Sequence, residues 1–157
     1  LKGDVLLKIA NQLDDTRVGA VGTWGLLSEN LNHFHEEVDF GEIDALQGYC
    51  FAFRRDILST VGLMRECFRF YRILDIDFSF QIKAKGYKIL ADGSLPMLRH
   101  KHRQWESLEE TEREELSKKN FKRFLVRWKN RTDLLVGRDS RDIYDKLNLK
   151  RSNGSNK

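Results

Sequence analysis

The sequence has few cysteines and no long apolar segment, and these two shortages exclude several classes of protein. Cys50 and Cys67 are the only cysteines in 157 residues, and their spacing forms neither a CxxC motif nor a zinc-ligand pattern. Apolar residues surround both, which favours buried thiols in a reducing cytoplasm over a disulfide. No apolar run approaches the roughly 20 residues that cross a bilayer, so the sequence predicts neither a transmembrane helix nor a signal peptide.

The excess of positive over negative charge is also small. The 28 Lys and Arg residues stand against 24 Asp and Glu residues, a net charge of +4. Nucleic-acid binding needs basic charge gathered on one face, so no nucleic-acid partner is predicted. With 40% hydrophobic and 33% charged residues, the composition excludes disordered and fibrous proteins. The length suits one domain with one core.

Helical and strand patterns alternate along the chain, which predicts an α/β or α+β fold. The expected helices cover residues 5–13, 57–61, 75–85 and about 108–130, the last behind a capping box at Ser107 and Glu110. The expected strands cover residues 18–21, 45–53 and 87–91, whereas residues 28–42 are expected to be irregular. Three short strands make a thin sheet, so we expect part of the domain to lie before Leu1. Residues 138–157 are expected to form a short helix and a disordered polar tail.

Two carboxylates lie at the start of the helix predicted in the segment LDIDFSFQIKAKGY, residues 74–87. The positive end of the helix dipole favours the ionised form of Asp75 and Asp77. An ionised carboxylate that faces a cleft can accept a proton from a hydroxyl nucleophile. The alternative is a structural role for both, as an N-cap and a first-turn acid.

This segment resembles the C-terminal motif of family-two glycosyltransferases, which are inverting, nucleotide-sugar-dependent enzymes of the GT-A fold. In the family pattern, Asp75 takes the place of the catalytic base and Asp77 that of the second acid. Residues 86–87 match the closing Gly-Tyr pair. The sequence departs from the pattern twice, because Leu74 replaces the usual acid and Gln81 replaces the usual arginine.

Further segments match the family in the same order. Residues 47–55 resemble its glycine-containing strand beside the acceptor site, and residues 61–68 resemble the loop that follows. The rings of Tyr49 and Trp105 would stack on an acceptor sugar, although core packing is the more frequent role of such residues. The resemblance implies these acceptor-binding residues: Gly48, Tyr49, Arg54 and Trp105.

A divalent metal, Mn²⁺ or Mg²⁺, is the cofactor that the resemblance implies. Its ligands from this chain would be His100 first and His102 second, because the family places a histidine at about this point. Neutral imidazole suits Mn²⁺ tolerably. One alternative is that both histidines, with Lys101 and Arg103, form a solvated basic strand. Another is that Arg99 and Arg103 pair with phosphate.

Together these features predict a partial GT-A nucleotide-diphospho-sugar transferase fold, with few short strands, flanking helices and a long C-terminal helix. Residues 1–137 would be the C-terminal portion of a catalytic domain. It would transfer a sugar from a nucleotide-sugar donor to a hydroxyl of a saccharide or lipid-linked acceptor. The family's Asp-x-Asp nucleotide motif has no match before Asp75, so the donor-binding half is expected upstream and this chain alone is expected to be inactive. A chain that lacks half of its sheet would have an exposed sheet edge, and self-association would cover that edge.

The long helix supports a second hypothesis, a non-catalytic binding module. Its region 116–131 carries seven cations with no acid between them: Lys118, Lys119, Lys122, Arg123, Arg127, Lys129 and Arg131. A basic amphipathic helix can bind an anionic membrane surface or an acidic partner, which would place the protein at the inner face of the membrane. Acids before bases also complement a helix dipole, which is the structural alternative.

The absence of a nucleotide motif predicts that the 157-residue chain binds nucleotide sugars poorly on its own. Calorimetric titration with UDP-glucose and GDP-mannose should therefore give no micromolar binding. A micromolar dissociation constant for either sugar would contradict the expected division into two halves.

Overall fold

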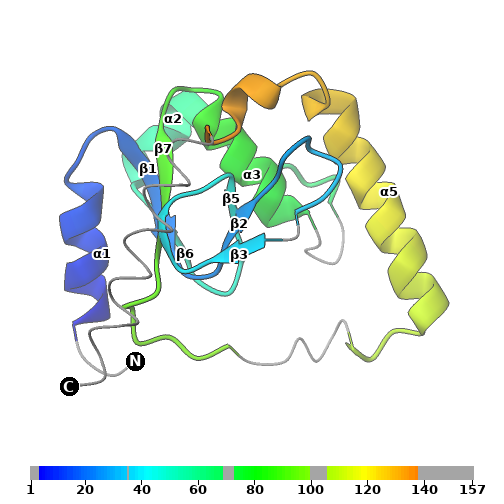
Figure 1. Cartoon of the computed structure of the whole chain (residues 1–157), viewed down its shortest axis with the longest axis horizontal. Helices are drawn as coiled ribbons and strands as arrows, with labels where there is room; N and C mark the ends of the chain where they lie inside the picture. The colour runs from blue at the N-terminus through cyan, green and yellow to red at the C-terminus, as the bar shows by residue number, and fades with distance from the viewer. Residues whose placement is uncertain (1–3, 35, 69–72, 100–105, 138–157) are drawn as a thin grey trace.

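The structure is a computed structural model that describes residues 4–34, 36–68, 73–99 and 106–137. Its helices are α1 (Val5–Leu13), α2 (Leu58–Val61), α3 (Leu74–Lys83) and α5 (Glu110–Trp128), with 3₁₀ turns η1 (Arg55–Ile57) and η2 (Thr132–Leu134). Its strands are β1 (Val18–Gly22), β2 (Gly25–Leu27), β3 (Glu36–Val38), β4 (Phe40–Glu42), β5 (Ala45–Leu46), β6 (Phe51–Phe53) and β7 (Lys88–Asp92). Figure 1 shows α1 and α5 on opposite sides of the strands, with α3 between the strands and α5. The helix and tail predicted for residues 138–157 lie outside the described residues.

The strands form two small sheets. One has the order β4-β7-β1-β6 and the other has the order β3-β2-β5. Strands β1 and β7 are parallel, with Val21 opposite Leu90, and the other pairs are antiparallel. The mixed α/β class that the alternating pattern predicted is therefore confirmed.

Glycine follows two of the helices: Gly62 directly follows α2, as the sequence predicted, whereas α3 ends at Lys83, before the predicted end at residue 85, and Gly86 lies in the turn after it. The φ angle is 88° at Gly62 and 85° at Gly86. Glycine adopts this left-handed backbone without a steric penalty, so it stops a helix cleanly. Five apolar residues at helical spacing predicted α1, and three of them, Val5, Ile9 and Leu13, are buried, whereas Leu6 and Ala10 are exposed.

The structure has more strands than the three that the sequence predicted. The region 28–42, expected to be irregular, contains β3 and β4. The strand predicted at residues 45–53 is two strands, β5 and β6, which belong to different sheets. These strands have two or three residues each, so they are too short for an alternating pattern to reveal them.

The starts of two helices differ from the expected capping. Glu109, not Ser107, occupies the N-cap position of α5, and its side chain makes no capping hydrogen bond. Asp4 occupies the N-cap position of α1, and its side chain makes no capping bond either. Only its backbone carbonyl takes part, by accepting a hydrogen bond from the N–H of Lys8 at 3.0 Å.

Helix α3 is buried on nearly every side, since each residue from 76 to 83 is buried. Phe78 and Ile82 pack into the apolar cluster that covers the two sheets. Ile76 and Phe80 pack into a second cluster, which contains the buried aromatic residues of α5. One helix therefore separates two apolar clusters, which explains why its apolar residues do not form a single stripe.

Asp77 is the polar centre of the second cluster, and none of its surface is exposed (0%). Its Oδ1 accepts hydrogen bonds from Trp128 Nε1 at 2.7 Å and from Arg65 at 3.2 Å. Its Oδ2 accepts one from Gln81 Nε2 at 3.1 Å. A buried carboxylate needs such donors to offset its lost hydration. These contacts therefore hold α5 and the segment around residue 65 against α3.

Lys83 anchors the other end of α3. Its Nζ donates to the carbonyl of Ile43 at 2.9 Å and to Asp44 Oδ1 at 3.2 Å. Asp44, with an exposed fraction of 0%, also accepts hydrogen bonds from the backbone N–H groups of Ser28 at 2.8 Å and Val136 at 2.6 Å. Buried charge thus fixes α3 near both of its ends.

Helix α5 presents a narrow buried stripe to α3 and charged residues elsewhere. Its buried residues are Asn120, Phe124 and Trp128. Leu116, Phe121 and Leu125 lie beside this stripe and are half-buried. Among the described residues, no helix combines the length and the apolar composition that crossing a membrane requires.

Both cysteines are free thiols as predicted, but only one of them has the predicted burial. Cys50 is buried and Cys67 is half-buried. Burial raises the pKa of the Cys50 thiol, and hydrogen bonds with Thr23 offset only part of that increase. A raised pKa leaves little reactive thiolate at neutral pH, so Cys50 acts as a packing residue.

Replacement of Trp128 by Phe removes the indole N–H that donates to Asp77 and keeps an aromatic ring. Because the lost bond goes to a buried carboxylate, we expect the free energy of unfolding to fall by about 1.5–3 kcal/mol. Urea unfolding followed by circular dichroism measures the change. Val126→Ala is the control on the same helix, since Val126 is 82% exposed, and it should change stability by less than about 0.5 kcal/mol. A loss in Trp128→Phe no larger than in the control would contradict this account of α5.

Candidate functional site

Asp75 lies at the exposed end of α3, as its second residue, and is only half-buried. Its Oδ2 accepts a hydrogen bond from the backbone N–H of Gly48 at 2.8 Å. Its Oδ1 accepts one from the backbone N–H of Ile76 at 3.0 Å. The positive end of the helix dipole favours negative charge here. The hydrogen bond between Gly48 and Asp75 therefore joins two segments, 27 residues apart. Each of these segments resembles a different motif of the glycosyltransferase family.

The Ser79 side chain holds α3 and the segment before Gly48 in a fixed position relative to each other. Its hydroxyl donates to the backbone carbonyl of Asp75 at 2.8 Å and accepts from the backbone N–H of Leu46 at 3.1 Å. Leu46 ends β5, so Gly48 follows two residues later and reaches the Asp75 carboxylate. A Cβ at residue 48 would lie 3.4 Å from Asp75 Oδ2, which means that the glycine keeps this side of the carboxylate open.

Two bulky residues near this contact have a strained backbone. Ile73, which directly precedes α3, has φ at 74°, and Trp24, between β1 and β2, has φ at 56°. Side chains larger than glycine rarely adopt this region, at a cost of about 1–3 kcal/mol each. Such strain persists only where the surroundings impose it, and it is frequent at functional sites.

An aromatic pair, Trp24 and Tyr49, continues the surface from Gly48. The two rings lie 5.5 Å apart at 70°, an edge-to-face contact, and both are half-buried. The backbone N–H of Gln47 donates to the carbonyl of Trp24 at 3.2 Å and ties the two loops together. The guanidinium of Arg99 lies 4.6 Å from the centre of the Tyr49 ring and 5.9 Å from that of Trp24. These distances are typical of cation–π contacts.

A polar trio, Glu37, Gln47 and Arg99, borders the aromatic pair. Arg99 donates to Glu37 Oε1 at 2.9 Å and to Gln47 Oε1 at 3.0 Å, and Gln47 Nε2 donates to the same Glu37 oxygen at 2.5 Å. The hydrogen bond from Gln47 and the charge of Arg99 hold the pKa of Glu37 below its usual range, although burial raises it. Hydrogen bonding with Tyr49, and then with Glu37, raises the pKa of Arg99.

Two residues predicted for the site have other contacts. Asp77 is fully buried between Trp128, Arg65 and Gln81. We therefore assign it a structural role and no contact with substrate. Arg54 donates to the carbonyls of Leu13 at 3.1 Å and Thr16 at 3.5 Å and pairs with Asp56 at 3.2 Å. It holds the end of α1, and none of these contacts brings it to Asp75.

The remaining predicted site residues, His100, His102 and Trp105, lie outside the described residues. Within the described ranges, no cluster of three or more His, Cys, Asp or Glu side chains is placed to hold a metal ion. The described part of the chain therefore provides no ligand set, and the ligands expected at residues 100 and 102 stay a prediction. Arg99, the last residue before them that is described, lies against Tyr49.

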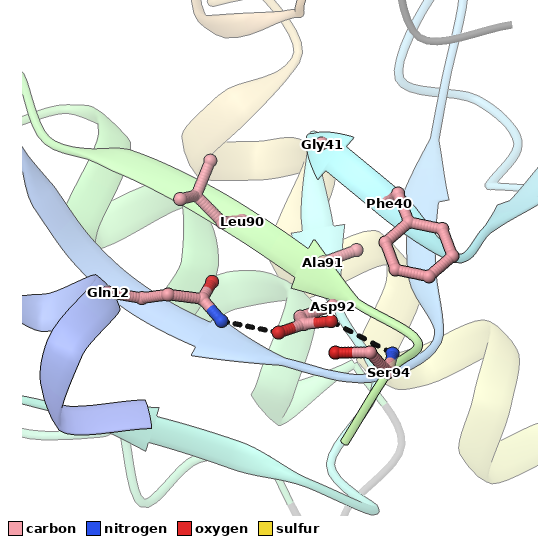
Figure 2. A pocket seen from close by; sticks show the side chains of 7 residues that line it. All are labelled: Gln12, Phe40, Gly41, Leu90, Ala91, Asp92 and Ser94. Atoms are coloured by element: carbon pink, nitrogen blue, oxygen red, sulfur yellow. Dashed lines mark hydrogen bonds between the residues drawn. The ribbon is translucent and has the colours of Figure 1, made fainter. Parts of the chain in front are cut away.

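A second candidate is a hollow of about 350 Å³ at the edge of the four-stranded sheet. Figure 2 shows the carboxylate of Asp92 there, between the side-chain amide of Gln12 and the backbone N–H of Ser94, which donates to it at 2.9 Å. Burial raises the pKa of Asp92, but these hydrogen bonds and the charge of Lys8 outweigh it and hold the pKa below its usual range. The Asp92 carboxylate therefore already has two donors within the chain, and the hollow contains none of the residues that the sequence predicted for a site.

Several of the cations in the region 116–131 have contacts within the chain. Lys118 pairs with Glu114 at 2.9 Å, and Arg123 donates to the carbonyl of Cys67 at 2.6 Å. Arg127 lies 4.6 Å from the centre of the Trp128 ring, and Arg131 pairs with Asp133 at 2.9 Å. Four of the seven cations therefore have a partner within the chain, although the pairs of Lys118 and Arg131 are exposed and contribute little to stability.

Sequence reasoning missed Trp24 and Glu37 and proposed a different role for Arg99. The sequence predicted an irregular region around Glu37 and, as one alternative, phosphate pairing for Arg99, and it assigned no role to Trp24. The local signal was weak, since only the two glycines at 22 and 25 mark the turn that holds Trp24. Comparison with protein-family models, curated proteins and solved structures found no match to this chain.

The polar trio predicts a pH dependence. Because the pKa of Glu37 is depressed in the folded state, its contacts are intact above the usual glutamate pKa of about 4.3 and are lost as the pH falls through the lower folded value. A carbon NMR titration of the Glu37 carboxyl should give a midpoint below about 4.3. Gln47→Leu should raise this midpoint, since the amide of Gln47 is the largest cause of the shift, whereas Gln12→Leu should not. Equal midpoints in the wild type and Gln47→Leu would contradict the assignment.

Proposed function

We propose that this chain is the acceptor-side portion of an inverting glycosyltransferase with a GT-A fold, in which Asp75 is the general base. One observation carries the proposal, the 2.8 Å hydrogen bond between the Gly48 N–H and the Asp75 carboxylate. It unites the segment that resembles the family's base motif with the segment that resembles its acceptor strand. The mixed sheet, with parallel β1 and β7, is compatible with part of such a fold.

The reaction would be a single displacement. An acceptor hydroxyl oxygen attacks the anomeric carbon of the donor sugar and forms the new glycosidic bond. The bond from that carbon to the nucleoside diphosphate breaks, and the leaving group takes the electron pair. Asp75 accepts the hydroxyl proton as the bond forms. The configuration at the anomeric carbon inverts because attack and departure occur on opposite faces.

The environment of Asp75 suits a base. The carboxylate is half-buried and therefore stays accessible to an acceptor, in contrast to the fully buried Asp77. The Gly48 N–H occupies one carboxylate oxygen and fixes its direction. The strained backbone at Ile73 sets the position from which α3 presents Asp75.

The proposal also requires binding sites for the nucleotide-sugar donor and for a divalent metal, and the described residues do not provide these sites. Metal bound near the leaving diphosphate would neutralise its charge. We expect the donor-binding half in a longer protein that contains this chain. The binding-module hypothesis ranks second, because four of the cations on which it depends already have partners within the chain.

Asp75→Asn in the full-length protein tests the proposed base, because the amide keeps the size of the side chain but cannot accept the proton. We expect the rate of transfer to fall by about 10²–10⁴-fold, with donor binding unchanged. Release of nucleoside diphosphate from UDP-glucose, UDP-galactose, UDP-N-acetylglucosamine and GDP-mannose, with mixed disaccharides as acceptors, measures the rate. Calorimetry measures donor binding.

Asp56→Asn is the matched control. It is the same chemical change at a side chain that is 74% exposed and pairs with Arg54, so the rate should stay within about twofold of the wild type. Full activity in Asp75→Asn would remove this residue from the role of base. No release from any of these donors by the wild type would contradict the transferase itself.

A further inference from the structure

We propose that Ser79 is a positioning residue for the proposed base, because its hydroxyl fixes the hydrogen bond between Gly48 and Asp75. This inference rests on the proposed function and deepens it, since it names a buried side chain that controls the base from inside the fold. Ser79 has an exposed fraction of 0%, so it offers no surface to a substrate. Its effect on the reaction passes through Asp75 and through the segment that carries Gly48.

Three hydrogen bonds form a closed ring around the base. The Gly48 N–H donates to Asp75 Oδ2 at 2.8 Å, and the Ser79 hydroxyl donates to the Asp75 carbonyl, also at 2.8 Å. The Leu46 N–H completes the ring by donating to the Ser79 hydroxyl oxygen at 3.1 Å. A single hydroxyl is thus bonded to both of the segments that meet at the proposed base.

The bond from Leu46 distinguishes Ser79 from an ordinary helical serine. A serine within a helix often donates to the carbonyl four residues earlier, and that bond alone acts within one turn of the helix. Here the same hydroxyl also accepts from a residue 33 positions away in the sequence. Leu46 is the last residue of β5, which lies at the end of the order β3-β2-β5 and packs against α3. The hydroxyl therefore joins the helix to this strand.

The stretch of chain from Leu46 to the base contact is short. Gly48 follows Leu46 by two residues, which span at most about 7 Å. Within this stretch, the Gln47 N–H donates to the Trp24 carbonyl at 3.2 Å and holds the chain to the loop between β1 and β2. The bond from Leu46 to Ser79 holds it to α3, the helix that carries the base. Loss of the hydroxyl therefore allows Gly48 to move relative to the carboxylate.

The direction of a carboxylate matters for its action as a base. A hydrogen bond weakens steeply as its angle departs from the optimum, so the Gly48 bond restrains the Asp75 side chain only while its geometry is kept. A displacement of a reacting group by about 1 Å can lower a rate about 10²-fold. Ser79 thus contributes to the rate through the geometry of the base.

NMR of the full-length protein, with glycine labelled by nitrogen-15, tests this geometry without turnover. The Gly48 amide signal is identified by its loss in Gly48→Ala. Because this N–H bonds to a carboxylate, its chemical shift should change when Asp75 takes up a proton, and Asp75→Asn should abolish that change. We expect the size of this pH-dependent change to fall by at least about half in Ser79→Ala.

Ser79→Cys is a second variant that keeps nearly the same side-chain volume. A thiol is a weak donor and a weak acceptor, so this variant should lose signal change as Ser79→Ala does. Ser59→Ala is the matched control, since the exposed Ser59 hydroxyl also donates to a carbonyl of the preceding turn, at 2.8 Å. Trp128→Phe destabilises α3 through Asp77 instead. Both controls should keep the wild-type change of the Gly48 signal.

Transfer kinetics are the second readout. In Ser79→Ala we expect kcat to fall on the order of tenfold, because the base is misplaced. The KM for the nucleotide sugar should stay within about twofold of the wild type, since this loss is confined to the reacting geometry. Trp128→Phe should keep kcat within about threefold of the wild type, which separates a positioning role from a general loss of stability.

The inference is overturned if the wild-type Gly48 signal shows no pH-dependent change that Asp75→Asn abolishes. A full change in both Ser79→Ala and Ser79→Cys, or an equal loss in Trp128→Phe, would overturn it as well. So would an unchanged kcat in Ser79→Ala. Because the amide measurements involve no turnover, they decide the geometry separately from the activity of Asp75→Asn, which tests the proposed function itself.

Discussion

The burial of α3 is the constraint on which the rest of the structure depends. The helix lies between two apolar clusters, and it can do so only because each of its buried polar side chains has a partner. Asp77 receives hydrogen bonds from Trp128, Arg65 and Gln81, and Lys83 donates to Asp44. Loss of one partner in such an arrangement leaves a buried charge unsatisfied, which is far more costly than a lost surface contact. The position of α3 is therefore fixed, and with it the direction in which its exposed end points.

The candidate site follows from this fixed position. Ser79 is buried in the middle of α3, and its hydroxyl bonds both to the Asp75 carbonyl and to the backbone N–H of Leu46. These two bonds hold the segment that carries Gly48 against the helix. The strained residues Ile73 and Trp24 occur where the buried framework meets this surface. Rigid elements thus hold a half-exposed carboxylate, and loops that the same elements anchor supply the aromatic and polar groups around it. This division between a rigid base and surrounding loops is common to many binding and catalytic sites.

The sequence could predict what depends on local signals. The apolar spacing and the closing Gly86 delimited α3, so Asp75 was correctly placed at the start of a helix. Asp77 has the same local signals, but its burial depends on Trp128, 51 residues away, and sequence alone could not distinguish the two acids. The two-residue strand that precedes Gly48 was not separable from β6, because it is defined by contacts that are distant in sequence: its pairing with β2, and the bond from Leu46 to Ser79, which lies 33 residues away. Trp24, Glu37 and Arg99 meet only through the tertiary fold, so the aromatic and polar surface had no local sequence signal.

The central claim is that the Asp75 carboxylate, held by Gly48, receives the proton of an acceptor hydroxyl. A crystal structure of the full-length protein with a bound nucleoside diphosphate and an acceptor saccharide tests it most directly. We expect the reacting hydroxyl oxygen about 2.6–3.2 Å from an Asp75 carboxylate oxygen, with the diphosphate on the far side of the sugar position. An acceptor bound away from Asp75, with its hydroxyl beside a different acid, would contradict the account.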